Sequence, residues 1–313
     1  MSISFILDNE NKYWDKLISK SSHGTIFSLS SHLNFYKNTF EVLKYVFFDE
    51  KNINVIACVP IILGDETPLF NVYNGIIFNQ EILEIKNNSR RYSKILNYSE
   101  KIISLITKKH QNINLTLNPK FEDLRAFQWH NYHEKLKPKF KIELRNTGIL
   151  DLKNINKDQI MEKFRTVRRQ EFKKFSHLVT NDGEVDDLIA LYKKTFNRQD
   201  IKINDNFLIN LFNYCNYAME KKFARINFLK NPNGNFVSAS LFIFDDKNAY
   251  YLIGASDPEL RKEFPSSPAI AEQILYFHEK KLNIDFVGVN SPLRGDFKLS
   301  FSPKIVKYFN VDL

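Results

Sequence analysis

The chain has 313 residues, a formal net charge of +9, 43% hydrophobic and 14% aromatic residues, and two cysteines. This length is enough for two domains of ordinary size, and the apolar content excludes a disordered chain. Cys58 and Cys215 are far apart and have no metal-ligand neighbours, which favours a reduced, cytoplasmic protein. The N-terminus lacks a signal-peptide pattern, and no apolar run approaches the ~20 residues of a membrane-spanning helix.

The positive charge is spread along the chain, with local concentrations at 90–109 and 165–174. A moderately basic protein can meet nucleic acid, anionic lipid or phosphorylated small molecules. The spread is too diffuse to indicate a nucleic-acid surface. We therefore expect no DNA partner, and a peripheral contact with a membrane stays open.

The first half predicts strands and helices from apolar periodicity and turn signals. The expected elements are a strand at 1–7, helices at 13–20 and from Ser30, strands at 42–49, 54–63 and 68–78, a helix at 89–109 and a strand at 112–117. Residues 119–138 form a connecting region. Strand-like segments follow at 141–144 and 147–150.

The second half repeats this plan. It predicts a charged helix at 157–175, a short strand at 178–181, helices at 184–195 and 206–221, strands at 224–230, 236–245 and 249–255, a helix from Ser266 to Lys281, and strands at 284–289 and 305–309. The short polar links between the three consecutive strands are typical of antiparallel hairpins. We predict an α/β (α+β) fold with mixed, mostly antiparallel sheets flanked by helices, in domains 1–145 and 146–313.

Polar side chains follow the strand predicted at 284–289. Asn290-Ser291-Pro292 and Arg294-Gly295-Asp296 read as two turns, and Phe297-Lys298 as a loop that opens the next apolar segment. A strand that ends in such a loop delivers polar groups to one place, as sites of α/β domains do. The alternative is an ordinary turn with a solvated basic rim.

Residues 150–313 resemble the FemAB-like (Fem-type) branch of the GNAT acyltransferase superfamily. The similar segments are R-T-V-R-R-Q-E-F-K-K-F at 165–175, L-Y-K-K-T-F-N-R-Q at 191–199, V-S-A-S-L-F-I-F and Y-Y-L-I-G-A-S-D between 237 and 257, and D-F-V-G…F-K-L-S-F at 285–301. The W-D-K-L-I…G-T-I-F-S pattern at 14–28 resembles the start of the branch's first domain. The resemblance implies two tandem GNAT-like domains, the first degenerate and shaping an acceptor cleft, the second catalytic.

The resemblance also implies amide formation, in which an activated acyl group passes to an amine. In Fem-type enzymes a Phe-Lys pair lies at the reaction centre, and Phe297-Lys298 matches it, with Lys298 stabilising developing negative charge. One difference is Ser302-Pro303, where the branch often has glycine after the position of Phe301. An amine nucleophile must also lose a proton, and Asp285 and Asp257 are the candidate general bases. For each of these residues a structural role, as a surface lysine or a salt-bridged acid, is the alternative.

Further residues are candidates for binding. The free N–H groups at the Ser266-Ser267-Pro268 helix start can hold a pyrophosphate, although the glycine-rich loop of most GNAT enzymes is lacking and simple capping is the alternative. The remaining candidates for substrate binding are Phe297, Arg294, Asn290, Arg198, Arg169 and Tyr192. The seven histidines show no metal-ligand clustering, so we expect neither a metal site nor a bound cofactor.

The sequence thus predicts a cytoplasmic N-acyltransferase that joins an acyl group from acyl-CoA, as co-substrate, to an amino group. The acceptor is predicted to be a cell-envelope or polysaccharide precursor such as an amino sugar, either a small molecule or lipid-linked. One alternative is a Fem-type aminoacyltransferase that uses aminoacyl-tRNA and a peptidoglycan precursor, with tRNA as partner. Another is a non-catalytic protein that binds an anionic polymer.

Overall fold

The computed structural model describes residues 2–49, 54–66, 68–197 and 203–313. It divides into two compact units, one of Met1–Arg145 with Lys307–Leu313 and the other of Asn146–Val306. The chain changes unit inside β6 (Lys141–Leu150) and again inside β12 (Lys304–Asp312). The sequence predicts one domain for 146–313. The last residues of β12 pair with β5 (Asn114–Thr116), which belongs to the first unit.

The first unit contains a four-stranded antiparallel sheet in the order β1-β2-β3-β4. Its strands are β1 (Ile3–Leu7), β2 (Glu41–Asp49), β3 (Asn54–Leu63) and β4 (Ile77–Phe78), and its helices are α1 (Trp14–Lys20), α2 (Ser30–Leu33), α3 (Gln80–Leu83), α4 (Asn88–Thr107) and α5 (Arg125–Trp129). The strand predicted at 68–78 shortens to β4, because Phe70 and Tyr73 have positive φ and interrupt the extended backbone.

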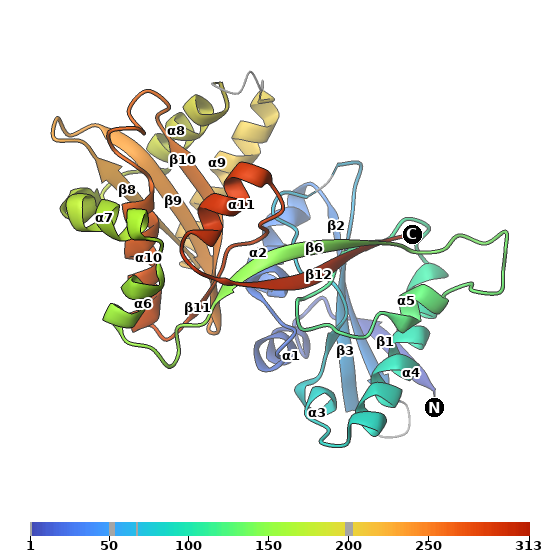
Figure 1. Ribbon diagram of the computed structural model, residues 1–313. Helices are drawn as coiled ribbons and strands as arrows, with labels where there is room; N and C mark the ends of the chain where they lie inside the picture. Colours follow the sequence, from blue (N-terminus) through green and yellow to red (C-terminus); the bar gives the residue numbers. More distant parts are fainter. Residues whose placement is uncertain (1, 50–53, 67, 198–202) are drawn as a thin grey trace. The chain divides into compact units, whose positions relative to one another are not determined.

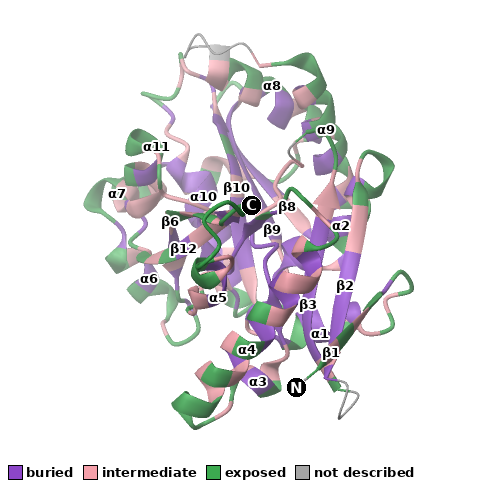
Figure 2. Ribbon diagram, turned by 90° about the vertical axis from the view of Figure 1, so that its right-hand side faces the viewer, coloured by how far each residue is buried: buried purple, intermediate pink, exposed green. Residues whose placement is uncertain are grey.

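The long helix α4 covers this core because its apolar residues repeat at helical spacing. Ile95, Tyr98, Ile102 and Ile106 are all buried in the same cluster as residues of β2 and β3. Each such side chain contributes roughly 1.5–3 kcal/mol by leaving water. Figure 2 shows this pattern as purple central strands and a helix with mixed faces.

The second unit contains α6 (Lys157–Lys163), α7 (Thr166–Phe175), β7 (Val179–Thr180), α8 (Val185–Asn197), α9 (Asp205–Glu220), β8 (Ala224–Lys230), β9 (Phe236–Phe244), β10 (Asn248–Ser256), α10 (Ser267–Glu279), β11 (Asn283–Asp285) and α11 (Pro292–Leu299). Its strands run β11-β10-β9-β8-β7, and the end of β6 flanks β11. All neighbours are antiparallel except β10 and β11, whose parallel pairing needs the crossover helix α10. The expected mixed α/β architecture is confirmed.

Two predicted elements of this unit differ from the structure. The helix predicted at 157–175 breaks into α6 and α7 because Phe164 and Arg165 are extended, which lets the buried Phe164 ring meet Phe301 edge-on at 5.2 Å. The turn and loop predicted at 292–298 form the helix α11, and the preceding strand ends at Asp285 instead of Val289.

Candidate functional site

A backbone kink at residues 286–289, here called the strand-end kink, follows β11. Val287 has a φ of 46° and Gly288 a φ of 90°. Valine at positive φ costs roughly 1–2 kcal/mol, whereas glycine adopts it freely. Such strain persists only where surrounding contacts impose it, and it concentrates at functional sites.

Asp285 and Thr147 hold the strand-end kink. The Asp285 carboxylate is buried, and its Oδ1 accepts hydrogen bonds from the Val287 N–H at 2.8 Å and the Thr147 hydroxyl at 2.5 Å. The Thr147 Oγ1 accepts in turn from the Gly288 N–H at 3.1 Å. With these hydrogen bonds Asp285 acts as a positioning residue, because its carboxylate fixes the backbone of the kink. Its predicted role as a general base stays a prediction.

Lys298 lies in the last turn of α11 and turns back onto the strand-end kink. Its Nζ donates to the carbonyl of Phe286 at 2.7 Å and to that of Gly288 at 2.9 Å. The approach is close because Gly295 has no side chain: a Cβ there would lie 2.4 Å from the Val289 carbonyl oxygen. The kink thus presents two carbonyls to one ammonium, and α11 carries that ammonium to them.

The Lys298 ammonium is largely removed from water. Burial lowers its pKa to about 8, Asp285 opposes that shift and Arg294 adds to it. Its Nζ lies 5.4 Å from the centre of the Tyr251 ring on β10. A partly desolvated ammonium beside an aromatic face interacts more strongly with nearby charge than one in water. At pH 7 a group with this pKa stays about nine-tenths protonated.

Strand pairing ends at this place. β10 pairs with β11 over Asn248–Tyr250 and Asn283–Asp285, and β10 then continues to Ser256. A bulge between Tyr251 and Ile253 shifts the register of β10 against β9. Figure 1 shows α11 beside the ends of these strands. Among the described residues, the parallel pair β10 and β11 therefore ends directly beside the Lys298 ammonium.

No protein-family model and no curated protein matches the chain. Among solved structures, FemX covers 99% of this chain and 97% of its own, with a TM-score of 0.66 and 13% identity. A tandem GNAT protein from the clavulanic acid biosynthesis pathway covers 100% and 98%, with a TM-score of 0.54 and 8% identity. The chain has a Fem-like fold of two GNAT domains. A conserved protein of unknown function from Bacteroides thetaiotaomicron also shares this fold, at TM-score 0.59, 14% identity and 100% coverage of both chains.

Two further predicted residues, Phe297 and Arg294, lie on α11 with Lys298, and a third, Tyr192, interacts with Arg294. Phe297 packs edge-on against Phe301, and the Arg168 guanidinium lies 5.1 Å over its ring. Arg294 is exposed on α11 and acts electrostatically on both Lys298 and Tyr192. Burial raises the pKa of Tyr192, whereas Arg294 opposes that shift. These groups and the strand-end kink form the candidate site.

Other predicted residues are engaged elsewhere. Asn290 exchanges two hydrogen bonds with the backbone of Asn146. Arg169 donates to the Glu162 carbonyl and the Thr166 hydroxyl, where α6 meets α7. Neither side chain is directed to Lys298 by a contact, and both tie loops in place.

Asp257 directly follows β10, and its carboxylate is engaged by Lys194 and by the backbone of Glu259. Burial would raise its pKa, but hydrogen bonds from Lys194 at 2.7 Å and the Glu259 N–H hold the pKa below its usual value. A carboxylate of low pKa is a weak base, so the geometry favours a structural role for Asp257.

The start of α10 already faces an anion. Ser266 makes no capping hydrogen bond, and the buried Ser267 hydroxyl bonds the Glu171 carboxylate, which also accepts from Arg168 at 2.5 Å. The predicted pyrophosphate contact at Ser266 and Ser267 therefore gains no support here. Arg198 lies outside the described residues.

Sequence reasoning missed Thr147, Tyr251 and Gly295, because each reaches the strand-end kink or Lys298 only through its register against a distant segment. Positive φ at Val287 also has no local sequence signal beyond the glycine that follows it. No group of three or more His, Cys, Asp or Glu in the described ranges could hold a metal ion. The described helices include none long and apolar enough to cross a membrane.

Proposed function

We propose that this protein is an N-acyltransferase that uses the Lys298 site to form an amide. The observation that carries the proposal is the desolvated Lys298 ammonium, fixed by two carbonyls at the point where β10 and β11 part. The fold shared with FemX and a tandem GNAT protein supports the same class of chemistry. The acyl donor we propose is acyl-CoA. The acceptor we propose is an amino group of a cell-envelope or polysaccharide precursor in the cytoplasm.

The chemistry requires stabilisation of an oxyanion. When an amine attacks a thioester, the carbon–nitrogen bond forms and the carbonyl oxygen becomes negative. The carbon–sulfur bond then breaks, and the proton lost by the amine balances the leaving thiolate. Lys298 has three N–H groups, and the two described partners leave one for that oxygen. Removing one such donor from a preorganised site typically costs ~2.7–4 kcal/mol in the barrier.

The surrounding residues have supporting roles in this proposal. Asp285 holds the kink and keeps Lys298 protonated, because its carboxylate opposes the effect of burial on the pKa. Arg294 and Tyr192 offer a cation and a phenol to the substrate. Phe297 supports Lys298 through its packing on Phe301.

The test begins with binding and ends with turnover. Thermal shift of the full chain against coenzyme A, acyl-CoAs, nucleotide amino sugars and charged tRNA identifies the donor and acceptor classes. Transfer is then measured by mass spectrometry for the unaltered protein, Lys298→Met and the exposed-lysine control Lys262→Met. We expect at least a hundredfold loss of kcat in Lys298→Met alone, about 2.7 kcal/mol. Equal turnover in Lys298→Met and the control would remove Lys298 from the mechanism.

A further inference from the structure

The segment at residues 129–141, here called the α5–β6 loop, projects from the first unit (green loop between α5 and β6, Figure 1). Residues 132–139 are all exposed. Three large apolar side chains stand in this short stretch: Trp129 is 47% exposed, Tyr132 63% and Leu136 101%. Single exposed apolar residues are ordinary, whereas a group on one projection marks an interaction surface.

The α5–β6 loop has a built conformation. The Asn131 side chain donates to the Pro138 carbonyl at 2.8 Å, and Lys139 Nζ donates to the Tyr132 carbonyl at 3.3 Å, so the two sides are tied together. Below these ties, Phe140 packs edge-on against the buried Phe127 at 5.2 Å. The tip therefore stands out from a fixed base, and its apolar side chains are held in water.

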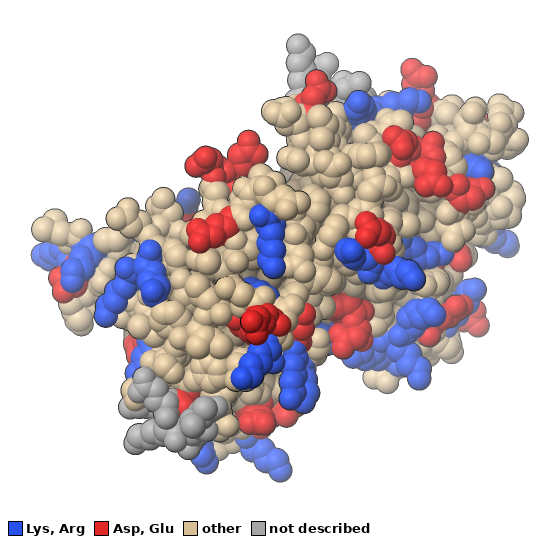
Figure 3. Space-filling view, turned by 180° about the vertical axis from the view of Figure 1, so that it is seen from behind, with Lys and Arg blue, Asp and Glu red and all other residues tan. Residues whose placement is uncertain are grey.

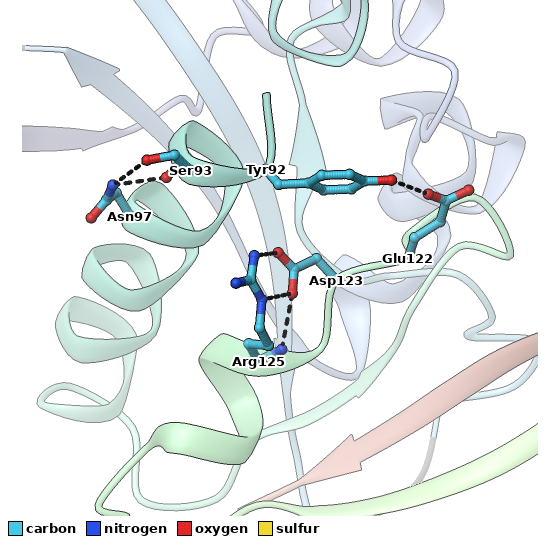
Figure 4. Close-up of polar contacts among 6 residues, drawn as sticks. All are labelled: Tyr92, Ser93, Asn97, Glu122, Asp123 and Arg125. Atoms are coloured by element: carbon cyan, nitrogen blue, oxygen red, sulfur yellow. Dashed lines mark hydrogen bonds and ion pairs between the residues drawn. The ribbon is translucent and has the colours of Figure 1, made fainter. Parts of the chain in front are cut away.

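The helix that leads into the loop is also fixed. Arg125 Nε and Nη2 grip the two oxygens of Asp123 at 2.8 and 2.7 Å, as Figure 4 shows beside α4. The same guanidinium lies 5.6 Å over the Trp129 ring. This stacking restrains Trp129 at the root of the loop while leaving half of its surface exposed.

The charge of the α5–β6 loop is mainly positive. Within residues 129–141 the chain has four lysines, Lys135, Lys137, Lys139 and Lys141, and one acid, Glu134, which pairs with Lys137 at 3.3 Å, while Lys141 also interacts with Asp312. Figure 3, in which this edge of the unit lies at the left, shows basic side chains beside uncharged surface. Lysine stems cover apolar surface while their heads stay hydrated, so lysines and exposed aromatics can occupy one surface together.

We propose that the α5–β6 loop docks on an anionic lipid surface, with Trp129, Tyr132 and Leu136 entering the headgroup layer. Tryptophan and tyrosine favour the membrane–water interface, and lysines beside them are attracted to acidic headgroups. A protein partner fits less well, because the core of protein interfaces is depleted in lysine. A nucleic acid offers no apolar environment for Leu136. The inference does not rest on the transferase proposal.

The expected binding is weak and reversible. Three side chains bury little apolar area, so zwitterionic lipid alone binds poorly and acidic lipid is required. Each lysine near the surface strengthens partitioning about fivefold. Salt weakens the attraction because it screens charge over about 10 Å at moderate ionic strength.

The experiment is co-sedimentation of the full chain with vesicles of phosphatidylcholine, with and without phosphatidylglycerol. The variants are Leu136→Ser with Tyr132→Ser, and Lys135→Gln with Lys137→Gln. All four side chains are exposed, so the fold is retained, and thermal unfolding checks this. We expect binding to acidic vesicles only, weakened about tenfold or more by either pair. Ile209→Ser and Lys173→Gln with Lys174→Gln, exposed sites on α9 and α7, are the matched controls and leave binding unchanged.

A second readout locates the contact. The chain has two tryptophans, and Trp14 is fully buried, so quenching by brominated lipid reports Trp129. We expect quenching only with acidic vesicles. The proposal is overturned by absent binding to acidic vesicles, by binding that survives both loop pairs, or by loss of binding only in the α7 control. A dimer disrupted by Leu136→Ser without vesicle binding would overturn it in favour of a second copy of the chain.

Discussion

Replacing Lys298 by methionine removes an ammonium that loses water contact on folding, and the shift in its pKa sets how the free energy of unfolding changes with pH. Burial lowers the pKa of Lys298 to about 8 from its ordinary value of 10.5. The unfolded chain therefore binds more protons than the folded one between pH 8 and 10.5, and the free energy of unfolding rises with pH across that window. From pH 7 to 9.5 the gain is about 2 kcal/mol, and Lys298→Met lacks it.

The assay must read the second unit alone, because the two units need not unfold together. Cys215 lies fully buried in the second unit, so its thiol reacts with iodoacetamide only after that unit opens. Urea titrations at pH 7 and 9.5, with labelling at Cys215 measured by peptide mass spectrometry, give the free energy of opening. Other titrating groups cancel when Lys298→Met is compared with the unaltered protein.

The comparison has a clear refuting outcome. If both proteins gain equal stability between pH 7 and 9.5, the ammonium keeps its water in the folded state and the electrostatic basis of the site is wrong. Lys262→Met, at an exposed position, must follow the unaltered protein. At pH 7 we expect Lys298→Met to unfold within about 1–2 kcal/mol of the unaltered protein, because relief of the buried charge offsets the lost carbonyl partners.

Three other outcomes are expected. Asp285→Asn destabilises the second unit by about 1–3 kcal/mol, read at Cys215, because it removes the charged acceptor of the Val287 N–H. It also lowers the pKa of Lys298, so activity is lost at a lower alkaline pH than in the unaltered protein. Gly295→Ala costs roughly 1–3 kcal/mol in the same assay, since its Cβ meets backbone that cannot move aside. In the first unit, burial lowers the pKa of His23 to about 4, so stability falls by about 2 kcal/mol from pH 7 to 4.5, and His23→Gln reduces that fall in tryptophan fluorescence.

The hairpins of the second unit were predictable because local chemistry sets their turns. The strand predicted at 224–230 matches β8, and those at 236–245 and 249–255 match β9 and β10 to within one residue at each end. The links between them contain asparagine, aspartate, glycine and proline, which favour turns irrespective of distant contacts. The start of α10 was predictable for a similar reason, since proline in a first helical turn stops extension backwards.

The segment after β11 was not predictable in the same way. Pro292 and Gly295 read as turn residues, yet Pro292 begins α11 and Gly295 lies within it against the Val289 carbonyl. The strand ends early because Asp285 accepts the Val287 N–H, which turns the backbone out of the sheet. Both outcomes depend on contacts made after folding. Local propensity therefore predicts that polar residues follow a strand, but which of them contact one another depends on tertiary contacts.

Lysine acts in two opposite physical situations in this chain. At Lys298, burial removes water from the ammonium, which lowers its pKa and strengthens its interaction with nearby charges. Displacing either carbonyl that it contacts would therefore change its protonation. On the α5–β6 loop the lysines keep their water, so each is weak alone and their effects add only toward an extended negative surface. The net charge of +9 distinguishes neither situation. The backbone around each lysine decides which situation it meets. At the strand-end kink two carbonyls bind the Lys298 ammonium, whereas the hydrogen-bonded α5–β6 loop holds its lysines exposed to solvent.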